Sequence, residues 1–310
     1  MRLFIIEERP KEEREFSVAV VIPTLNRPKE LLLTLEQLKG QTLKPKIVII
    51  VDSSHDLIDT SIYNTGWSLF HVKSTVRSSA VQRNIGMKML ENSIFDFLLF
   101  HDDDMDISPN YIFRMVESFK LGEGVVGVSG IALSGDEEDL LIKKKREKST
   151  LFIRPGTVTK GGINVPVTRL DGSIVECDWL IGCSMWRKLS AKVYFESKLT
   201  GYAIFEDVIF SMKVKKEEKA KLLVNTGIAI RHRREGSNST DTFSKKRDWI
   251  VNRFIASRLL PENIWYSRMW IINVLYLFFT LLRIPLNPKV YFIEFKGLLA
   301  GISIILRAYE

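Results

Sequence analysis

A short apolar segment that runs directly into aspartates is the stretch of this sequence most able to do chemistry. Phe97–Phe100 reads FLLF, and Asp102, Asp103 and Asp104 follow after one histidine. An unbroken apolar run of this length is typical of a central strand in a parallel sheet with both faces covered. Ligands of such sheets bind at the carboxyl ends of the strands. Because neighbouring carboxylates repel one another when ionised, we expect a cation beside them.

The residue types favour a divalent metal as that cation. Carboxylate oxygens are hard ligands that suit Mg2+ or Mn2+, and magnesium is often held by one or two carboxylates while substrate phosphates complete its shell. A solvated acidic loop, with Pro109 opening the next helix, is an alternative that fits the same residues. The choice depends on what else gathers at this edge of the sheet.

The composition is that of a folded protein with an excess of basic residues. Of 310 residues, 45% are hydrophobic and 26% charged, which excludes disordered and fibrous classes. The net charge of +8 comes from patches such as KKKREK at 143–148, which attract polyanions unless they are simply solvated loops. Nucleic acid is disfavoured as a partner, because no zinc-finger, helix-turn-helix or RNA-recognition signature accompanies the charge.

Two features of the sequence bear on the compartment. Cys177 and Cys183 are too few for a disulfide framework or, unaided, for a tetrahedral zinc site, which favours a reduced, cytoplasmic setting. Residues 1–15 contain a short apolar run followed at once by alternating charge, so we expect an N-terminal arm in place of a secretory signal.

Alternating strand and helix patterns position the aspartates in a parallel α/β sheet. The expected strands are residues 17–22, ended by Pro23, and residues 47–51, 70–73, 97–100, 124–129 and 222–230. The expected helices are residues 28–38, 78–90, 109–119 and 203–215. A charged loop or lid is expected at 135–148, and glycine-rich hairpins at 151–180.

The C-terminal part of the chain has a different pattern. Residues 269–282 read MWIINVLYLFFTLL, flanked by Arg268 and Arg283, and residues 297–306 form a second apolar run. Both runs are shorter than the ~20 apolar residues of a membrane-spanning helix. Flanking arginines and tryptophans are typical of a helix in a lipid headgroup layer, so membrane-surface contact is favoured over a packed hairpin or a dimer interface.

Further motifs follow the expected strands, and together they resemble one enzyme family. In chain order they are VVIPTLNRP, VDSS at 51–54, RSSAVQRNIG at 77–86, FHDDD at 100–104, CDWLIGCSMWR at 177–187 and FED at 205–207. This set is similar to the family 2 glycosyltransferases, nucleotide-sugar enzymes with the GT-A fold. The resemblance covers most of residues 16–235 and implies a Rossmann-like mixed sheet with helices on both faces. Residues 236–310 then form a C-terminal helical region.

The resemblance implies a binding site for a nucleoside-diphosphate sugar. The residues implied to cradle the nucleotide base are Pro23, Thr24, Asn26, Arg27 and Asp52. Proline, asparagine and aspartate also end strands by ordinary turn chemistry, which is the alternative for this loop. Arg77 and Arg83 are implied to contact the base or the diphosphate, since a guanidinium matches phosphate with two parallel hydrogen bonds. A solvated helix position is the alternative for Arg83.

The aspartates match the DxD element of the family. Asp102 is implied to contact ribose or metal and Asp104 to bind the metal directly, with Asp103 as supporting charge in the donor site. His232 follows the last expected strand and is a candidate third metal ligand or phosphate contact, or else a structural histidine. His101 is assigned no role.

Glu206 and Asp207 resemble the acidic pair of the family at the start of a helix. Inverting transfer needs a general base for the acceptor hydroxyl, and the motif assigns this role to Asp207. Glu206 then binds the acceptor or maintains geometry, unless both carboxylates simply complement the helix dipole. Asp178, Trp179 and Gly182 are implied to line the sugar and acceptor side, although Trp179 also fits a buried core position.

The sequence therefore predicts a metal-dependent inverting glycosyltransferase, of hexosyl or deoxyhexosyl groups, acting at the cytosolic face of a membrane. Its expected partners are a nucleotide-sugar donor, a lipid-linked or polysaccharide acceptor, an anionic membrane surface and, through the C-terminal helices, a second copy. Two other classes stay open. A sugar-nucleotide nucleotidyltransferase usually carries a glycine-rich basic loop where this chain has PTLNRP, and a non-catalytic sugar- or membrane-binding module needs no metal. The donor is not identified, because fold does not fix substrate.

Overall fold

The computed structural model describes seven ranges of the chain: residues 16–61, 66–134, 153–190, 192–199, 201, 203–233 and 242–308. The N-terminal arm expected at 1–15, the charged loop or lid expected at 135–148 and the arginine at position 234 lie outside the described residues. Both cysteines are buried and free.

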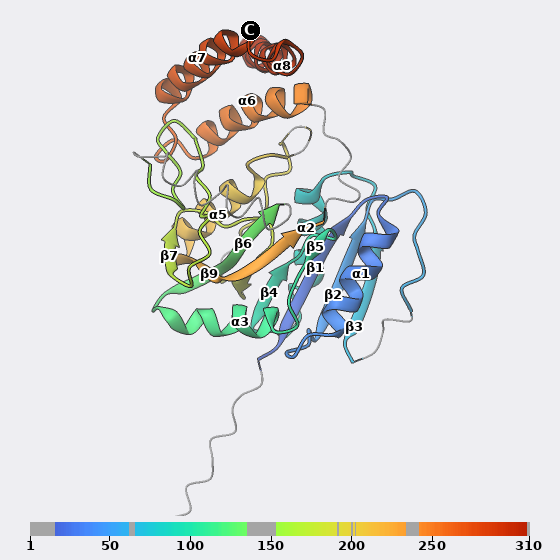
Figure 1. Ribbon diagram of the computed structural model, residues 1–310. Coiled ribbons are helices and arrows are strands. Elements are labelled where there is room, and N and C mark those ends of the chain that lie inside the picture. Colours follow the sequence, from blue (N-terminus) through green and yellow to red (C-terminus); the bar gives the residue numbers. More distant parts are fainter. Residues whose placement is uncertain are drawn as a thin grey trace, which may run out of the picture.

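A nine-stranded mixed sheet forms the centre of the described part (Figure 1). Its order is β3 (Ser68–Lys73), β2 (Ile47–Asp52), β1 (Val18–Thr24), β4 (Phe97–Phe100), β8 (Ser184–Arg187), β6 (Val125–Ser134), β9 (Lys221–His232) and β5 (Met105–Asp106), with β7 (Ile174–Cys177) also paired to β9. The first four strands in this order are parallel, as the sequence predicted. Strand β8 runs antiparallel to both β4 and β6, and makes the sheet mixed.

Helices cover both faces of the sheet because the strands alternate two sets of apolar side chains. In β1, Val20 packs in a cluster with α1 (Pro28–Lys39) and α3 (Tyr111–Ser118). Val21 points to the other face and packs with α2 (Ser79–Met89) and α5 (Glu206–Glu217). Helix α2 lies so close to β1 that a Cβ at Gly86 would come within 2.5 Å of Val21 Cγ1.

The expected end of the first strand is wrong by two residues. Strand β1 continues through Pro23, which pairs with Val51, to Thr24, which pairs with Asp52. Proline lacks an N–H, but the pairing of β1 with β4 already ends at Val21, so no ladder hydrogen bond is lost on that side. Thr24 and Asp52 therefore leave the sheet side by side.

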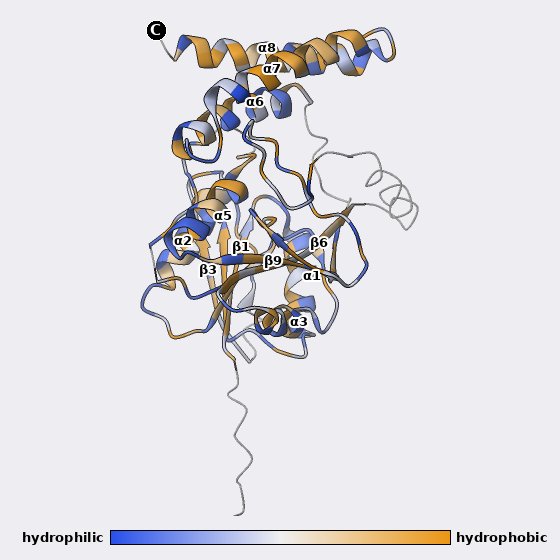
Figure 2. Cartoon of the chain, turned by 90° about the vertical axis from the view of Figure 1, so that its left-hand side faces the viewer, coloured by the Kyte–Doolittle hydropathy of each residue, from blue (hydrophilic) through white to orange (hydrophobic). Residues whose placement is uncertain are grey.

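Three helices form a separate layer, at the top of Figures 1 and 2. They are α6 (Thr242–Leu259), α7 (Tyr266–Arg283) and α8 (Pro288–Arg307). Helix α6 joins the layer to the sheet domain through a buried cluster that contains Val208 and Ile209 of α5 together with Ala256. Within the residues that the structure describes, none of the helices combines the length and the apolar character that a membrane span requires.

A buried arginine ties α6 to its neighbours. The Arg253 guanidinium donates to the carbonyl oxygens of Gly161 and Gly162 and, at 2.6 Å, to Oδ1 of Asn273 in α7. It also stacks 4.1 Å from the ring centroid of Trp249. Burial lowers the pKa of Arg253 to about 9. These contacts hold α6, α7 and the loop at 161–162 together.

We expect Arg253→Met to destabilise this layer strongly. The two glycine carbonyls and the Asn273 amide lose their donor, and each unsatisfied buried polar group costs about 1–3 kcal/mol, so the free energy of unfolding should fall by roughly 3 kcal/mol or more. Urea unfolding followed by circular dichroism measures the change. Arg258→Met, an exposed arginine of the same helix, is the control and should stay within about 0.5 kcal/mol of the wild type. Equal effects of the two substitutions would contradict the anchoring role.

Candidate active site

The carboxyl ends of three parallel strands bring the predicted donor residues to one edge of the sheet. Strands β2, β1 and β4 are neighbours and end at Asp52, Thr24 and Phe100. Gln82 of α2 joins the first two ends, because its Nε2 donates to the Thr24 carbonyl at 2.7 Å and to the Val51 carbonyl at 2.6 Å. The residues after these strands therefore share one edge of the sheet, as the sequence predicted.

The part of this edge next to β2 is held in a fixed conformation by polar contacts. Asn26 has a left-handed backbone with φ of 54°, and its N–H donates to Ser54 Oγ at 2.6 Å. Ser54 in turn donates its N–H to Asp52 Oδ1, and His71 of β3 lies 3.1 Å from Asp52 Oδ2. Burial works against ionisation of Asp52, but hydrogen bonds from His71 and Ser54 outweigh it and lower the pKa. Asp52 is thus a rigid, ionised acceptor.

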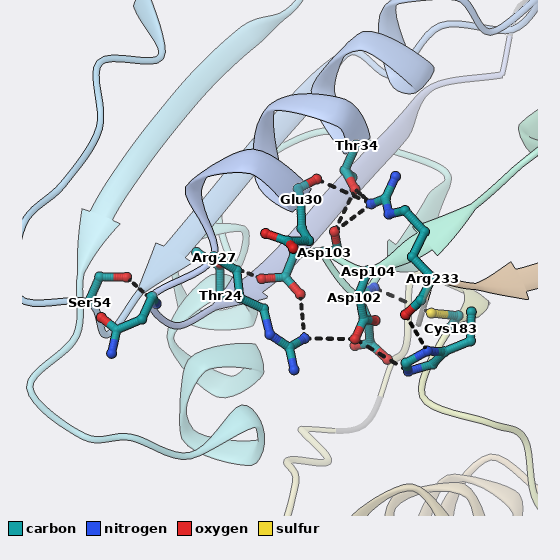
Figure 3. Close-up of polar contacts among 12 residues, drawn as sticks. Thr24, Arg27, Glu30, Thr34, Ser54, Asp102, Asp103, Asp104, Cys183 and Arg233 are labelled. Atoms are coloured by element: carbon teal, nitrogen blue, oxygen red, sulfur yellow. Dashed lines mark hydrogen bonds and ion pairs between the residues drawn. The ribbon is translucent and has the colours of Figure 1, made fainter. Parts of the chain in front are cut away.

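The three consecutive aspartates meet three different sets of partners (Figure 3). Asp103 is buried, accepts from Thr24 Oγ1 at 2.5 Å and contacts Arg27 Nη1 at 3.1 Å. Burial raises the pKa of Asp103 to about 6 although these partners favour its ionised form. Asp104 shares the same Arg27 nitrogen at 2.7 Å through Oδ2. Arg27, expected to cradle the base, therefore pairs with two carboxylates of residues 102–106, which we call the aspartate loop.

His232 lies next to Asp104 because of strand pairing. Strand β5 follows the aspartates and pairs Met105 with His232 at the end of β9. The His232 Nε2 atom lies 3.3 Å from Asp104 Oδ2, and Nδ1 lies 2.9 Å from the Arg233 carbonyl. Because a carbonyl only accepts, Nδ1 carries the proton and, in the neutral ring, Nε2 presents a lone pair toward Asp104.

The donor set fits a metal that shares its shell with a substrate. No group of three or more His, Cys, Asp or Glu side chains converges on one point among the described residues. Asp104 and His232 supply one oxygen and one nitrogen, and magnesium or manganese sites in enzymes often contain only one or two protein ligands beside phosphates and water. Asp102, the other expected metal ligand, pairs with Arg83. Its contact with a metal stays a prediction.

Arg233, next to His232, is not directed toward the cleft. Its guanidinium donates to Thr34 Oγ1 at 2.8 Å, to the Asp103 carbonyl at 2.6 Å and to Asp106 Oδ1 at 2.9 Å. Figure 3 shows it reaching the backbone of the aspartate loop from the side opposite Arg27. Arg233 thus fixes this loop against α1, a structural function that the sequence pattern did not indicate.

Arg83 connects the aspartate loop to the acidic pair. Its Nη2 donates to Asp102 Oδ1 at 2.6 Å, and its Nη1 pairs with Glu206. Only 3% of the Arg83 side chain is exposed, and its guanidinium lies 5.4 Å from the ring centroid of Phe195. Burial opposes ionisation of Arg83, but Glu206 and Asp102 outweigh it and raise its pKa. This burial excludes the alternative of a solvated helix position for Arg83, and its expected contact with base or diphosphate stays a prediction.

Small neighbours complete this network. Ser79, at the start of α2, donates to Glu206, and the Asp102 N–H donates to Cys183 Sγ at 3.3 Å. A Cβ on Gly182 would lie 2.9 Å from Arg83 Nη2, so the absence of a side chain there leaves room for the guanidinium. Ser79, Cys183 and Phe195 were not predicted. Ser79 and Cys183 lie inside the motifs RSSAVQRNIG and CDWLIGCSMWR, which is the only signal that the sequence offered for them.

Asp207 has a strongly perturbed carboxyl group. The chain enters α5 through two left-handed residues, Ala203 with φ of 51° and Phe205 with φ of 83°, conformations that are costly for side-chain-bearing residues and recur at functional sites. Burial, followed by the neighbouring charge of Glu206, raises the pKa of Asp207 from the ordinary 3.8 to about 7. Such a carboxyl group can accept a proton near neutral pH, as a general base must.

The remaining predicted residues lie around this centre. Trp179 is 7% exposed and packs with Phe205, and a cavity of about 200 Å³ borders it. Asp178 pairs with Lys215 at 3.0 Å, and Arg77 is exposed before α2. The assignment of these residues to sugar, acceptor or diphosphate stays a prediction. A cavity of about 790 Å³ between α5 and the end of α6 contains none of the aspartates of this site.

The mixed sheet with helices on both faces, together with matches to known sequences and structures, defines the class of protein, the glycosyltransferases of the GT-A fold. Residues 19–170 match the sequence model described as glycosyl transferase family 2. The chain carries a family 2 glycosyltransferase domain, which confirms the resemblance seen in the sequence motifs. No curated protein sequence matches the chain.

Solved structures share this fold at low sequence identity. GalNAc-T7, crystallised with UDP, GalNAc and Mn2+, gives a TM-score of 0.56 at 14% identity over 80% of this chain and 48% of the other. S. aureus TarS 1–349 in complex with UDP-GlcNAc gives 0.52 at 18% identity over 80% and 71% of the two chains. The chain thus spans about half of the GalNAc-T7 structure. At these identities the likeness establishes the fold alone.

The raised pKa of Asp207 predicts a specific pH dependence of stability. A carboxyl group whose folded pKa exceeds its unfolded pKa stabilises the fold fully below about pH 4, and this contribution is lost as pH rises through about 7. We expect the unfolding free energy of the wild type, relative to Asp207→Asn, to fall over this interval. Urea unfolding at several pH values measures it, and the comparison cancels the similar contribution of Asp103. A pH-independent difference would show that Asp207 keeps an ordinary pKa.

Proposed function

We propose that the protein is a metal-dependent inverting glycosyltransferase. It moves a hexosyl or deoxyhexosyl group from a nucleoside-diphosphate sugar to a hydroxyl group of a lipid-linked or polysaccharide acceptor. The observation that carries this proposal is the Arg83 bridge, which joins Asp102 of the aspartate loop to Glu206, the neighbour of Asp207. A donor-binding edge and a group with the proton affinity of a general base are thereby held in one site.

The residues at the ends of β1 and β2 are suited to hold the nucleotide. Asp52 is an ionised acceptor for a ring N–H of the base, and the Asn26–Ser54 contact fixes the loop around it. The exposed Arg77 and the partly exposed Arg27 supply positive charge for the diphosphate. UDP in the structures of TarS and GalNAc-T7 is in keeping with a nucleotide ligand for this fold.

Asp104 and His232 would hold a divalent metal, Mg2+ or Mn2+. When bound, such a metal neutralises charge that develops on the leaving diphosphate. Arg27, whose Nη1 contacts Asp104 Oδ2, would share that oxygen with the metal. Its guanidinium would also be close enough to the loop to contact the phosphates of the donor.

Asp207 removes the proton of the acceptor hydroxyl group. The acceptor oxygen forms a bond to the anomeric carbon while the bond from that carbon to the diphosphate oxygen breaks, and the proton passes to the Asp207 carboxylate. Attack from the face opposite the leaving group inverts the configuration. Glu206 assists by raising the proton affinity of Asp207 through its negative charge and by holding Arg83 in place.

We expect Asp207→Asn to abolish sugar transfer while nucleotide binding survives. The amide cannot accept the hydroxyl proton at neutral pH, and no donor contact is assigned to this side chain. Transfer is measured as release of nucleoside diphosphate from UDP-, GDP- and dTDP-sugars, and binding as a thermal shift with the matching diphosphate. Asp59→Asn, an exposed aspartate, is the control and should leave both unchanged. Retained turnover in Asp207→Asn would rule out its assignment as base.

The proposed metal ligands make a second prediction. Asp104→Asn should weaken Mn2+-dependent binding of the diphosphate by roughly tenfold or more, because one of two protein ligands is lost. Titration calorimetry with nucleoside diphosphate, with and without Mn2+, measures this. Asp106→Asn, whose wild-type carboxylate pairs with Arg233 and Gln37, should keep the metal dependence. Wild-type binding that is insensitive to metal would contradict the proposal, and a preference for nucleoside triphosphate with sugar phosphate would favour a nucleotidyltransferase.

A further inference from the structure

Apolar side chains cover the outward face of α7 and α8, the side away from α6. Among the most exposed are Ile271 at 59%, Val274 at 58%, Phe278 at 52%, Leu282 at 56%, Leu286 at 80% and Leu306 at 56%. Positions 271, 274, 278 and 282 recur at helical spacing and form a continuous stripe along α7. Figure 2 shows the two helices as a mainly hydrophobic layer on top of the molecule. We call this surface the outer apolar face.

A helix that faces water is polar outside and apolar inside, whereas α7 has polar residues on its buried side and apolar residues on its exposed side. Its buried side contains Asn273, which accepts from Arg253, and Thr280, which donates to the Tyr276 carbonyl. Helix α8 turns Gly297 and Gly301 toward α6, where a Cβ at Gly301 would come within 2.8 Å of the Arg247 carbonyl. Small and polar residues thus share the inner contacts with Met269, Leu298 and Ile305, while many large apolar side chains are directed outward. An exposed apolar surface of this kind marks an interaction site.

Positive charge surrounds the outer apolar face. The basic residues between positions 264 and 308 are Arg268, Arg283, Lys289, Lys296 and Arg307, and all five are exposed. The one acidic residue in this interval, Glu294, is half-buried and pairs with Lys246 at 3.4 Å. At the start of α7, the Arg268 guanidinium lies 4.4 Å from the ring centroid of the exposed Trp265.

We propose that the outer apolar face docks on an anionic lipid surface, with α7 and α8 lying parallel to it. Apolar side chains at helical spacing, flanked by tryptophan and basic residues, are the features by which helices bind at the boundary between headgroups and acyl chains. The exposed cations meet anionic headgroups at this depth. Helices of 18 and 20 residues present about 27 and 30 Å of apolar length to the membrane plane.

Charge distinguishes a lipid surface from a second copy of the chain. A two-fold dimer brings the same patch of both subunits together. The five exposed cations of one copy would then face those of the other, and the described residues of α7 and α8 offer no exposed carboxylate to compensate them. An anionic headgroup layer supplies the missing negative charge.

The docking proposal extends the proposed function, and it relies on that function for the nature of the acceptor. Helix α5 begins with Glu206 and Asp207 and packs its Val208 and Ile209 against Ala256 of α6. The outer apolar face is therefore connected to the acidic pair through continuous packing. A lipid-linked acceptor held in the docked membrane is presented to the same side of the molecule as this pair.

Vesicle flotation of the full chain tests the inference. We expect binding to vesicles of phosphatidylcholine mixed with an equal amount of phosphatidylglycerol, and much weaker binding to phosphatidylcholine alone or at raised salt. The double variant Val274→Glu, Phe278→Glu should bind the anionic vesicles roughly tenfold less, since two exposed apolar side chains that would enter the lipid are replaced by charges. Phe113→Glu, which alters an exposed apolar residue of α3, is the matched control and should bind as the wild type does. Thermal unfolding verifies that both variants fold.

The outcomes separate this inference from the proposed function. Transfer to a soluble acceptor without flotation of the wild type would overturn the docking surface and leave the glycosyltransferase assignment standing. Flotation without any transfer would support the docking surface and overturn the glycosyltransferase assignment. If the wild type is a dimer by light scattering, does not float, and the double variant is a monomer, the outer apolar face is a subunit interface and the lipid proposal is wrong.

Discussion

The buried guanidinium of Arg83 is the interaction on which the candidate site depends. An arginine with 3% of its side chain exposed is tolerated because Asp102 and Glu206 both pair with it, and losing both partners would leave an uncompensated buried charge. These partners lie 19 and 123 residues from Arg83 in sequence. A single side chain therefore sets the positions of α2, the aspartate loop and the start of α5 relative to one another.

Ion pairs with arginine also hold the aspartate loop. Asp103 and Asp104 share Arg27, and Asp106 pairs with Arg233, so every aspartate of the loop has a basic partner within the protein. Three arginines therefore offset much of the negative charge of the four aspartates, and one of them, Arg83, is shared with Glu206. Asp207 differs from these aspartates, because its nearest charge is the like charge of Glu206. Burial and this like charge raise the pKa of Asp207 to about 7, above the value of about 6 for Asp103, and a base requires such a proton affinity.

The sequence predicted the parallel strands and the sharing of one edge by Asp52 and the aspartates because both follow from local apolar periodicity and from a general property of α/β sheets. It also placed Glu206 at a helix start. It did not reveal that Asp102 and Glu206 would bind Arg83, or that Arg233 would hold the aspartate loop in place. It also did not reveal that β5 would pair with the end of β9, which brings His232 to Asp104. These contacts join segments more than a hundred residues apart or depend on rotamers, and neither is encoded in spacing along the chain.

Helix α5 connects the chemistry to the C-terminal layer. Its first turn carries the acidic pair, its middle is buried against α6, and α6 in turn holds α7 and α8 through Arg253 and the close approach of two glycines. The outer apolar face is consequently joined to the sheet domain through the packing of α6 against α5. Its distance from Asp207 is determined by close-packed side chains, and such interiors deform little. The distance of the site from the membrane surface would then have to match the position of the hydroxyl group on a lipid-linked acceptor. The packing of α6 against α5 sets this distance.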